Sequence, residues 1–315
     1  MRDHSARGLE TSYARPWPGW CCSYCSGPLD VRSHGLFCSA EGRWFATDRG
    51  VHRLLPEERR REMLPFLELY QRVRRDEGWR GEPGLPAVAP GHPHAKAWAA
   101  RAQRFRAGLQ AAEETLGPPP WRVLDAGAGC CWASARLLER GHQVAAVDLN
   151  LDVDDGLVAA ERFIPDPAAL PRAEADLEAL PVEPGDCDLV LVADALHYMP
   201  RLARTLVELR RVTRRGGVLL VLDSPVYRRR QDGEAVVADR MRAQARRYSL
   251  TIPRESVEGY LVLGELPDVF RSSGWNLEIR SWPPRPSEWA WDAIALVRGR
   301  RRPARYPILI ARRDG

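Results

Sequence analysis

The sequence predicts an α/β protein in which a doubly wound parallel sheet carries helices on both faces. From residue 118 onward, short apolar segments with strand character alternate with segments of helical period. Strands joined through helices make right-handed crossovers, so they run parallel and both faces of their sheet are covered. A second observation is a pair of glycines one residue apart, Gly127 and Gly129, between the first of these strands and a helix.

The predicted elements of the sheet follow one another in a regular order. The predicted strands are residues 122–125, 143–148, 173–176, 188–193 and 217–222, and the predicted helices between some of them are 133–140 and 202–213. Two later segments, 277–281 and 306–311, also have strand character. We expect the last of them to close the sheet.

The chain divides into three predicted regions. Residues 1–56 form a small module that contains a cluster of cysteines, residues 57–117 form a helical linker or cap, and residues 118–315 contain the sheet. Two segments inside the last region, 224–260 and 283–304, interrupt the alternation of strands and helices. Insertions that follow the carboxyl ends of strands lie over the ligand crevice, so we interpret both as helical lids.

Helical period is strong in the middle region. Residues 57–77 are predicted to be a helix interrupted at Pro65, and residues 95–116 a second helix. Between them, residues 78–93 carry four glycines and four prolines, which is typical of a linker or of an ordered lid loop. The charged first insertion is expected to contain a helix over residues 231–248.

The composition is that of a globular protein. Of 315 residues 44% are hydrophobic, and no apolar run approaches the roughly 20 residues of a membrane span. No apolar signal region follows the first residues, so we expect a cytoplasmic protein without a membrane partner. The formal charge of +5 permits an acidic partner but does not demand one. Lys96 is the only lysine, and a genome-wide codon bias is the simplest explanation for so much arginine.

The glycine loop "VLDAGAGCCW" excludes two familiar ligands. A dinucleotide site needs a third glycine three residues after the second, and Trp132 stands there; no lysine follows to make a phosphate-binding loop. Asp125 precedes the glycines instead, and Asp148 ends the next strand, where an acidic side chain can accept both hydroxyls of a ribose. A ligand with a ribose, a positive charge and no phosphate fits, and S-adenosylmethionine meets these conditions.

Residues 121–222 resemble the class I S-adenosylmethionine-dependent methyltransferases of the type 11 group, which have a Rossmann-like sheet. "VLDAGAGCCW", "VAAVDLN", "EADLEALP", "CDLVLVADALHYMP" and "RRVTRRGGVLLVLDSP" follow the order and spacing of the family's motifs. The resemblance implies which residues bind the cofactor. These are Asp125, Ala126, Gly127 and Gly129 at the methionine part, Asp148 and Leu149 at the ribose and adenine, Asp176 and Leu177 at the adenine amino group, and Asp194 and Ala195 near the sulfonium.

Methyl transfer gains most of its rate from holding the nucleophile and the methyl group in line. A general base is needed only if the acceptor must lose a proton. His197, with Tyr198 beside it, follows the fourth predicted strand and is the candidate for that catalytic role. The alternative is that both rings pack against the cofactor.

The N-terminal cysteines predict a zinc site. Cys22 and Cys25 form a Cys-x-x-Cys pair, and Cys38 follows after a gap, which resembles a zinc-ribbon or Trm112-like module and the amino-terminal zinc module of ribosomal-RNA guanine methyltransferases. A structural zinc wants four ligands, and Glu41 stands where a second pair would end. The candidates for the fourth ligand are Cys21, His34 and His52. The alternative is a module that has lost its metal.

The sequence therefore predicts a methyltransferase that uses S-adenosylmethionine, with a small molecule as the expected acceptor. Ribosomal or transfer RNA is the alternative acceptor, because the N-terminal module resembles one found in RNA methyltransferases. A hypothesis of another class is a non-catalytic protein that binds the cofactor or RNA on a methyltransferase scaffold. The intact Asp125 and Asp148 argue against it. The sequence does not indicate an oligomeric state.

Overall fold

The computed structural model describes residues 17–162, 164–249, 259–280 and 301–314. Their strands join into one mixed sheet of eleven, in the order β1-β2-β3-β4-β7-β6-β5-β8-β9-β13-β12, and β10 and β11 form a separate pair. The strands are β1 (Asp30–Arg32), β2 (Gly35–Cys38), β3 (Arg43–Asp48), β4 (Val51–Arg53), β5 (Arg122–Ala126), β6 (Gln143–Asp148), β7 (Arg172–Glu174), β8 (Cys187–Ala193), β9 (Thr213–Leu222), β10 (Val226–Tyr227), β11 (Leu261–Val262), β12 (Asn276–Arg280) and β13 (Ile308–Arg312).

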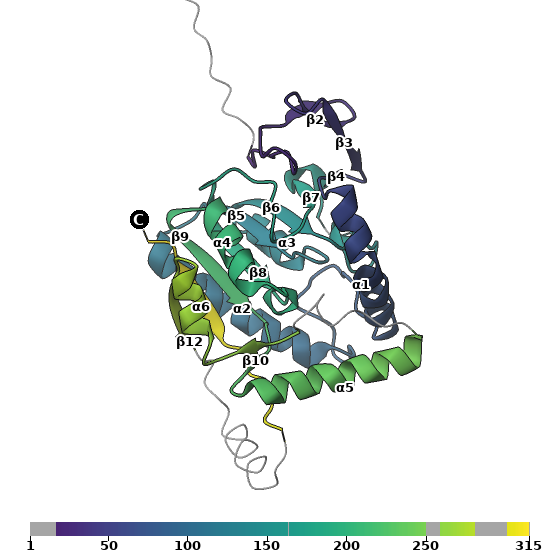
Figure 1. Cartoon of the computed structure of the whole chain (residues 1–315), viewed down its shortest axis with the longest axis vertical. Coiled ribbons are helices and arrows are strands. Elements are labelled where there is room, and N and C mark those ends of the chain that lie inside the picture. Colours follow the sequence, from purple (N-terminus) through teal and green to yellow (C-terminus); the bar gives the residue numbers. More distant parts are fainter. Residues whose placement is uncertain (1–16, 163, 250–258, 281–300, 315) are drawn as a thin grey trace, which may run out of the picture.

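Helices connect the strands and cover the sheet (Figure 1). The α-helices are α1 (Glu57–Asp76), α2 (Ala95–Leu116), α3 (Trp132–Leu138), α4 (Leu202–Val212), α5 (Arg230–Tyr248) and α6 (Leu266–Ser272). Three short 3-10 helices are η1 (Leu157–Arg162), η2 (Pro167–Ala169) and η3 (Leu196–Tyr198). No helix of the described residues has both the length and the apolar character that a membrane crossing requires.

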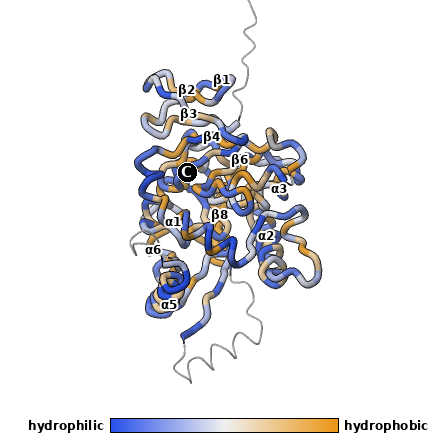
Figure 2. Tube along the Cα trace, turned by 90° about the vertical axis from the view of Figure 1, so that its right-hand side faces the viewer, coloured by the Kyte–Doolittle hydropathy of each residue, from blue (hydrophilic) through white to orange (hydrophobic). Residues whose placement is uncertain are grey.

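Alternating residues of the central strands bury their side chains on opposite faces of the sheet, which confirms the doubly wound fold. Val123, Val144 and Leu189 pack into one core with residues of α2 and α3. The next residue of each strand, Leu124, Ala145 or Val190, packs into a second core with residues of α4 and α6. Figure 2 shows the hydrophobic residues gathered along these strands, with more polar helices around them. A period of two along each strand therefore separates the two layers.

Helix α2 approaches the sheet closely at Gly108. A Cβ atom at this position would lie 3.0 Å from Leu222 Cδ2 and 3.1 Å from Leu220 Cδ2, both on β9. The absence of a side chain lets the helix axis lie near the strand. Trp98 and Phe105 on the same helix are buried beside α3, where Trp132 contacts both rings.

Two sequence expectations are wrong. Pro65 does not interrupt the first helix, since α1 runs without a break from Glu57 to Asp76. The last strand does not close the sheet either: β13 lies between β9 and β12 and pairs antiparallel with both. The final segment is therefore inserted into the sheet, and β12 forms its edge. Of the predicted insertion 283–304, residues 283–300 lie outside the described part.

The N-terminal region continues the central sheet. Strands β1 to β4 pair antiparallel with their neighbours, and β4 then pairs parallel with β7. Figure 1 shows β2 and β3 standing beyond β4 at one end of the molecule. The chain passes directly from β4 into α1, so the register of β4 on β7 sets where α1 begins.

Glu174 at the end of β7 joins three elements. Its side chain is buried and accepts hydrogen bonds from Arg53 Nε of β4 at 2.6 Å and from Arg60 Nη2 of α1 at 2.8 Å. Arg60 Nε also donates to it, at 3.1 Å. One carboxylate therefore holds the N-terminal strands and the first helix to the central sheet.

We expect Glu174→Ala to lower the free energy of unfolding by roughly 2 to 3 kcal/mol. The change removes the buried partner of Arg53 and Arg60. Each arginine is about a third exposed and keeps an exposed carboxylate, Asp48 or Glu57, which reduces the cost below the ~3 to 5 kcal/mol of a fully buried pair. Urea denaturation measures this. Glu62→Ala, which removes an exposed partner of Arg59, is the control and should change stability by no more than about 0.5 kcal/mol. Equal losses in the two variants would contradict the role of Glu174.

Candidate functional site

Two neighbouring cavities adjoin α1. The smaller, of about 100 Å³, lies at the carboxyl ends of the parallel strands and is bounded by α1 and α2. The larger, of about 320 Å³, lies between α1 and α5. Both are lined by Phe66, Tyr70, Arg74 and Tyr198. These four side chains therefore mark the junction between a cavity at the sheet and a chamber between two helices.

The glycine loop forms one wall of the smaller cavity, and its glycines are required by its geometry. Gly127 has φ +79°, and a Cβ atom there would lie 2.4 Å from Ala195 Cβ. Gly129 has φ +51°, and its N–H donates to Asp148 Oδ2 at 2.7 Å. The N–H groups of Gly127 and Ala128 donate to the carbonyl of Val147. The loop is thus held against the ends of β6 and β8, and its backbone can approach a ligand closely.

Carboxylates follow the ends of β6 to β9 in a row, and arginines of α1 and α2 pair with most of them. The pairs are Arg60 with Glu174, Arg59 with Asp176, Arg74 with Asp155, Arg101 with Asp194 and Arg104 with Asp223. Buried carboxylates are costly unless a charge and hydrogen bonds compensate them. The arginines therefore hold both helices across the ligand end of the sheet.

Asp148 differs from the other carboxylates in this row. It lines the smaller cavity and accepts hydrogen bonds from two backbone N–H groups, of Gly129 and Asn150, each at 2.7 Å. Among the described residues no arginine pairs with it. Burial raises the pKa of its carboxyl to about 6, against the two hydrogen bonds that lower it. Its remaining acceptor capacity is available to the hydroxyl groups of a ligand.

Asp125 lies beneath the loop and does not line either cavity. Its side chain is 1% exposed, accepts a hydrogen bond from Ser134 Oγ at 2.6 Å through Oδ2, and has no partner at Oδ1. Burial raises the pKa of this carboxyl to about 7. The geometry gives Asp125 a supporting position behind the loop.

The predicted cofactor residues fall into two groups, those that line the smaller cavity and those that do not. Those that line the smaller cavity are Gly127, Gly129, Asp148, Leu149, Leu177, Asp194 and Ala195. Those that do not are Asp125, Ala126 and Asp176. Ala126 is buried at the end of β5, and the Asp176 carboxylate accepts a hydrogen bond from Arg59 Nε at 2.6 Å.

Sequence reasoning missed most of the α2 contribution to this cavity. Trp98 and Arg101 line it, and the Arg101 guanidinium lies 5.0 Å from the ring centres of both Trp98 and Trp79. Arg74 of α1 also stacks on Trp79, at 4.4 Å. Trp98, three residues before Arg101 on one helical face, was the available signal for α2.

The two catalytic candidates lie in different surroundings. Tyr198 lines both cavities and contacts the rings of Phe66 and Tyr70, each with centres 5.9 Å apart. His197 lines neither; it is 3% exposed, with Nδ1 3.4 Å from Ser224 Oγ. Burial lowers the pKa of His197 to about 4 and raises that of Tyr198 to about 12. At neutral pH both rings are uncharged.

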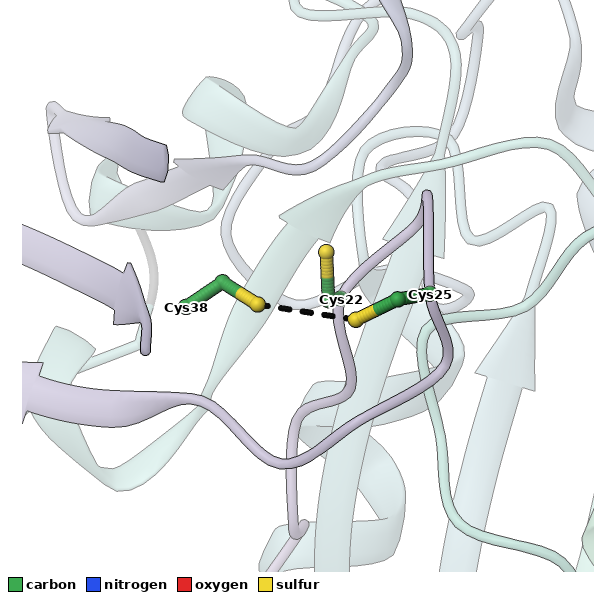
Figure 3. Close-up of side chains that lie close together, drawn as sticks. All are labelled: Cys22, Cys25 and Cys38. Atoms are coloured by element: carbon green, nitrogen blue, oxygen red, sulfur yellow. Dashed lines mark hydrogen bonds between the residues drawn. The ribbon is translucent and has the colours of Figure 1, made fainter. Parts of the chain in front are cut away.

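Three cysteines meet at the N-terminal end of the sheet (Figure 3). The Sγ atoms of Cys22, Cys25 and Cys38 lie within 4.8 Å of one another, and those of Cys25 and Cys38 are 3.5 Å apart. Two of the three candidates for a fourth ligand have other contacts: Cys21 Sγ lies 3.7 Å from the carbonyl of Gly19, and His52 Nδ1 lies 2.8 Å from Thr47 Oγ1. Among the described residues, no fourth histidine, cysteine or carboxylate joins the group.

Comparison with known proteins identifies the central segment. Residues 124–221 match the family model of the methyltransferase domain, type 11. This segment is therefore similar to a methyltransferase domain, and it lies within the residues whose motifs predicted that similarity. The match covers the strands from β5 to β9 and leaves α1, α2 and α5 outside.

The curated relatives are methyltransferases of different kinds. The chain is 42% identical over 98 residues to an uncharacterized methyltransferase of Mycobacterium tuberculosis, and 36% identical over 124 residues to a ubiquinone/menaquinone biosynthesis C-methyltransferase of Rhizobium leguminosarum. These stretches are 31% and 38% of this chain, and 37% and 48% of the relatives. The chain thus spans less than half the length of each relative it matches.

Solved structures of low identity resemble the fold. Phosphoethanolamine N-methyltransferase 2 of Haemonchus contortus is 16% identical, with a TM-score of 0.47, and the match covers 73% of this chain and 61% of that one. The 1,6-didemethyltoxoflavin-N1-methyltransferase of Burkholderia thailandensis is 19% identical, with a TM-score of 0.42, and the match covers 73% and 94%.

The raised pKa of Asp125 predicts a pH dependence of stability. The folded state keeps the proton of this carboxyl up to about pH 7, whereas the unfolded chain releases it near 3.8, so stability falls as the pH rises between these values. At about 1.4 kcal/mol per unit, the loss is on the order of 4 kcal/mol. Asp125→Asn should flatten this slope in urea denaturation followed from acid to mildly alkaline pH. The exposed Asp268→Asn is the control, and an equal slope in both variants would disprove the assignment.

Proposed function

We propose that this chain is an S-adenosylmethionine-dependent methyltransferase and that its acceptor is a small molecule. The observation that carries the first part is Asp148 beside the glycine loop, inside the segment that matches a methyltransferase domain. It is the carboxylate of the row that no arginine neutralises in the described part of the chain. The second part rests on the chamber between α1 and α5, which adjoins the smaller cavity.

The residues present fit this cofactor. The loop at Gly127 leaves no room for a Cβ atom, so its backbone can lie against a ligand. Asp148 would accept hydrogen bonds from the ribose hydroxyls, and Leu149 and Leu177 would flank the adenine. Arg74 and Arg101, which line the same cavity, would offer hydrogen-bond donors to the carboxylate of the methionine part.

When bound, the cofactor would supply an electrophilic methyl group to a lone pair of the acceptor, and its sulfur would keep the electrons of the broken carbon–sulfur bond as a neutral thioether. Tyr198 stands at the junction through which an acceptor in the chamber would reach the smaller cavity. Because its pKa is about 12, its hydroxyl stays protonated and can donate to the acceptor. We assign it to positioning the acceptor, with Phe66 and Tyr70 excluding water.

A surface of the N-terminal module favours RNA as the second candidate acceptor. Trp44 is 59% exposed, and its ring centre lies 4.9 Å from that of Phe37, with the two rings tilted by 45°. The Arg43 guanidinium lies 4.0 Å from the ring centre of the exposed Tyr24. Exposed aromatic rings beside arginine can stack on unpaired bases. If RNA is the acceptor, RNA should become methylated, and its affinity should fall steeply with salt concentration.

We expect Asp148→Ala to weaken the binding of S-adenosylhomocysteine by about 5- to 150-fold, because about 1 to 3 kcal/mol is lost with a charged hydrogen-bond acceptor. Isothermal titration calorimetry measures this, with the exposed Asp268→Ala on α6 as the control. Binding should also weaken as the pH falls through about 6, where the Asp148 carboxyl takes up a proton. No binding by the unaltered protein would overturn the proposed activity.

We also propose that Cys22, Cys25 and Cys38 hold a zinc ion. Two thiolates on a tetrahedral zinc with bonds of ~2.3 Å stand about 3.8 Å apart, and the 3.5 Å between Cys25 and Cys38 is close to this. Three thiolates would stabilise the turns that lead into β1 and β3. The fourth position would be filled by a further ligand, for which Cys21, His34 and His52 remain the candidates.

The purified protein should therefore contain about one equivalent of zinc by elemental analysis. Cys38→Ser should lose most of it, and a strong chelator should lower the melting temperature of the unaltered protein. Retention of zinc by Cys21→Ser would remove Cys21 from the candidates for the fourth ligand. Full zinc content in Cys38→Ser would refute the site.

A further inference from the structure

Apolar side chains of both helices line much of the chamber between α1 and α5. Phe66, Leu69 and Val73 line it from α1, and Val237 and Met241 line it from α5. The helix ends meet where Tyr248 Oη and Arg247 Nη2 both donate to Asp76 Oδ2, each at 3.0 Å. Its volume, about 320 Å³, is within the range of pockets that bind small molecules.

One cation in the lining of this chamber has no counter-charge. Arg74 pairs with Asp155, and Arg247 pairs with Asp76. Arg240 forms no ion pair or hydrogen bond within the part of the chain that the structure describes. The lining therefore combines apolar side chains with the unpaired guanidinium of Arg240. It also contains the carboxylate of Glu77, which follows Asp76 at the end of α1 and accepts a hydrogen bond from Trp79 Nε1 at 3.0 Å.

The Arg240 guanidinium lies beside the turn that carries Tyr198. A Cβ atom on Gly259 would be 2.7 Å from Arg240 Nη2, so the guanidinium lies against the backbone of Gly259. The N–H of Gly259 donates at 2.7 Å to the carbonyl of His197, the residue before Tyr198. The unpaired charge is thus close to the junction of the two cavities, where an acceptor would meet the methyl donor.

From this juxtaposition we infer that the acceptor is an amphipathic acid: a small molecule with an apolar ring or chain and one anionic group that Arg240 binds. This inference rests on the proposed function and names its substrate class. The apolar walls bury the body of the acceptor, and the planar fork of Arg240 can bind a carboxylate through two hydrogen bonds. A cationic acceptor of the same shape would be repelled by Arg240.

Three probes with one ring system and different charge test the inference. They are 2-naphthoate, 2-naphthalenemethanol and 2-naphthylmethylammonium, titrated calorimetrically into the full chain. We expect the anion to bind at least tenfold more tightly than the alcohol, and the cation to bind most weakly. Arg240→Met should abolish the preference for the anion, and Arg240→Lys should keep part of it. Arg246→Met, on the same helix but outside the lining, should keep all of it.

Several results would overturn the inference: no binding of naphthoate, equal binding of anion and alcohol, or an unchanged preference in Arg240→Met. Ala243→Trp, which places an indole in the chamber lining, should weaken all three probes; naphthoate binding that it leaves intact would put the anion elsewhere and sink the assignment. Titration of the same variants with S-adenosylhomocysteine separates the two proposals. Cofactor binding without a preference for the anion refutes only the acceptor class, whereas the preference without cofactor binding refutes methyl transfer.

Discussion

The pairing of carboxylates at the ends of the parallel strands with arginines of two helices is the constraint on which this structure depends. The carboxyl ends of the parallel strands β5 to β9 lie on the same side of the sheet, and acidic residues follow four of these strands. Such carboxylates cannot be buried without compensation, because desolvation of a charge costs more than most contacts return. Five arginines from α1 and α2 compensate these carboxylates, and the ion pairs hold both helices over the carboxyl ends of the strands.

The same pairing determines which acidic groups remain for a ligand. Glu174 and Asp176 form ion pairs with arginines of α1, and Glu174 also pairs with Arg53 of the N-terminal strands. Asp148 accepts only backbone N–H groups among the described residues, and it faces the cavity. The arrangement therefore attaches the surrounding helices with most of the carboxylates and leaves one at the place where the sheet meets the glycine loop.

The two cavities are built from different parts of the chain. The smaller is formed largely by the segment that matches a methyltransferase domain, with α1 and α2 closing it. The chamber is formed by α1 and α5, which lie outside that segment, and Tyr198 joins the two. One type of sheet end can thus be combined with different surrounding helices, since function is carried by the site and not by the fold alone.

The sequence by itself determined the order of the central strands with the helices between them, and the place of the glycine loop, because hydrophobic period and the Gly127–Gly129 loop are local features. It did not reveal that α1 passes through Pro65, that β13 lies between β9 and β12, or that Arg101 joins the cavity. It also did not separate Tyr198, at the junction, from His197, which is buried behind it. Only the tertiary structure decided these points, because they depend on contacts between residues far apart in the chain.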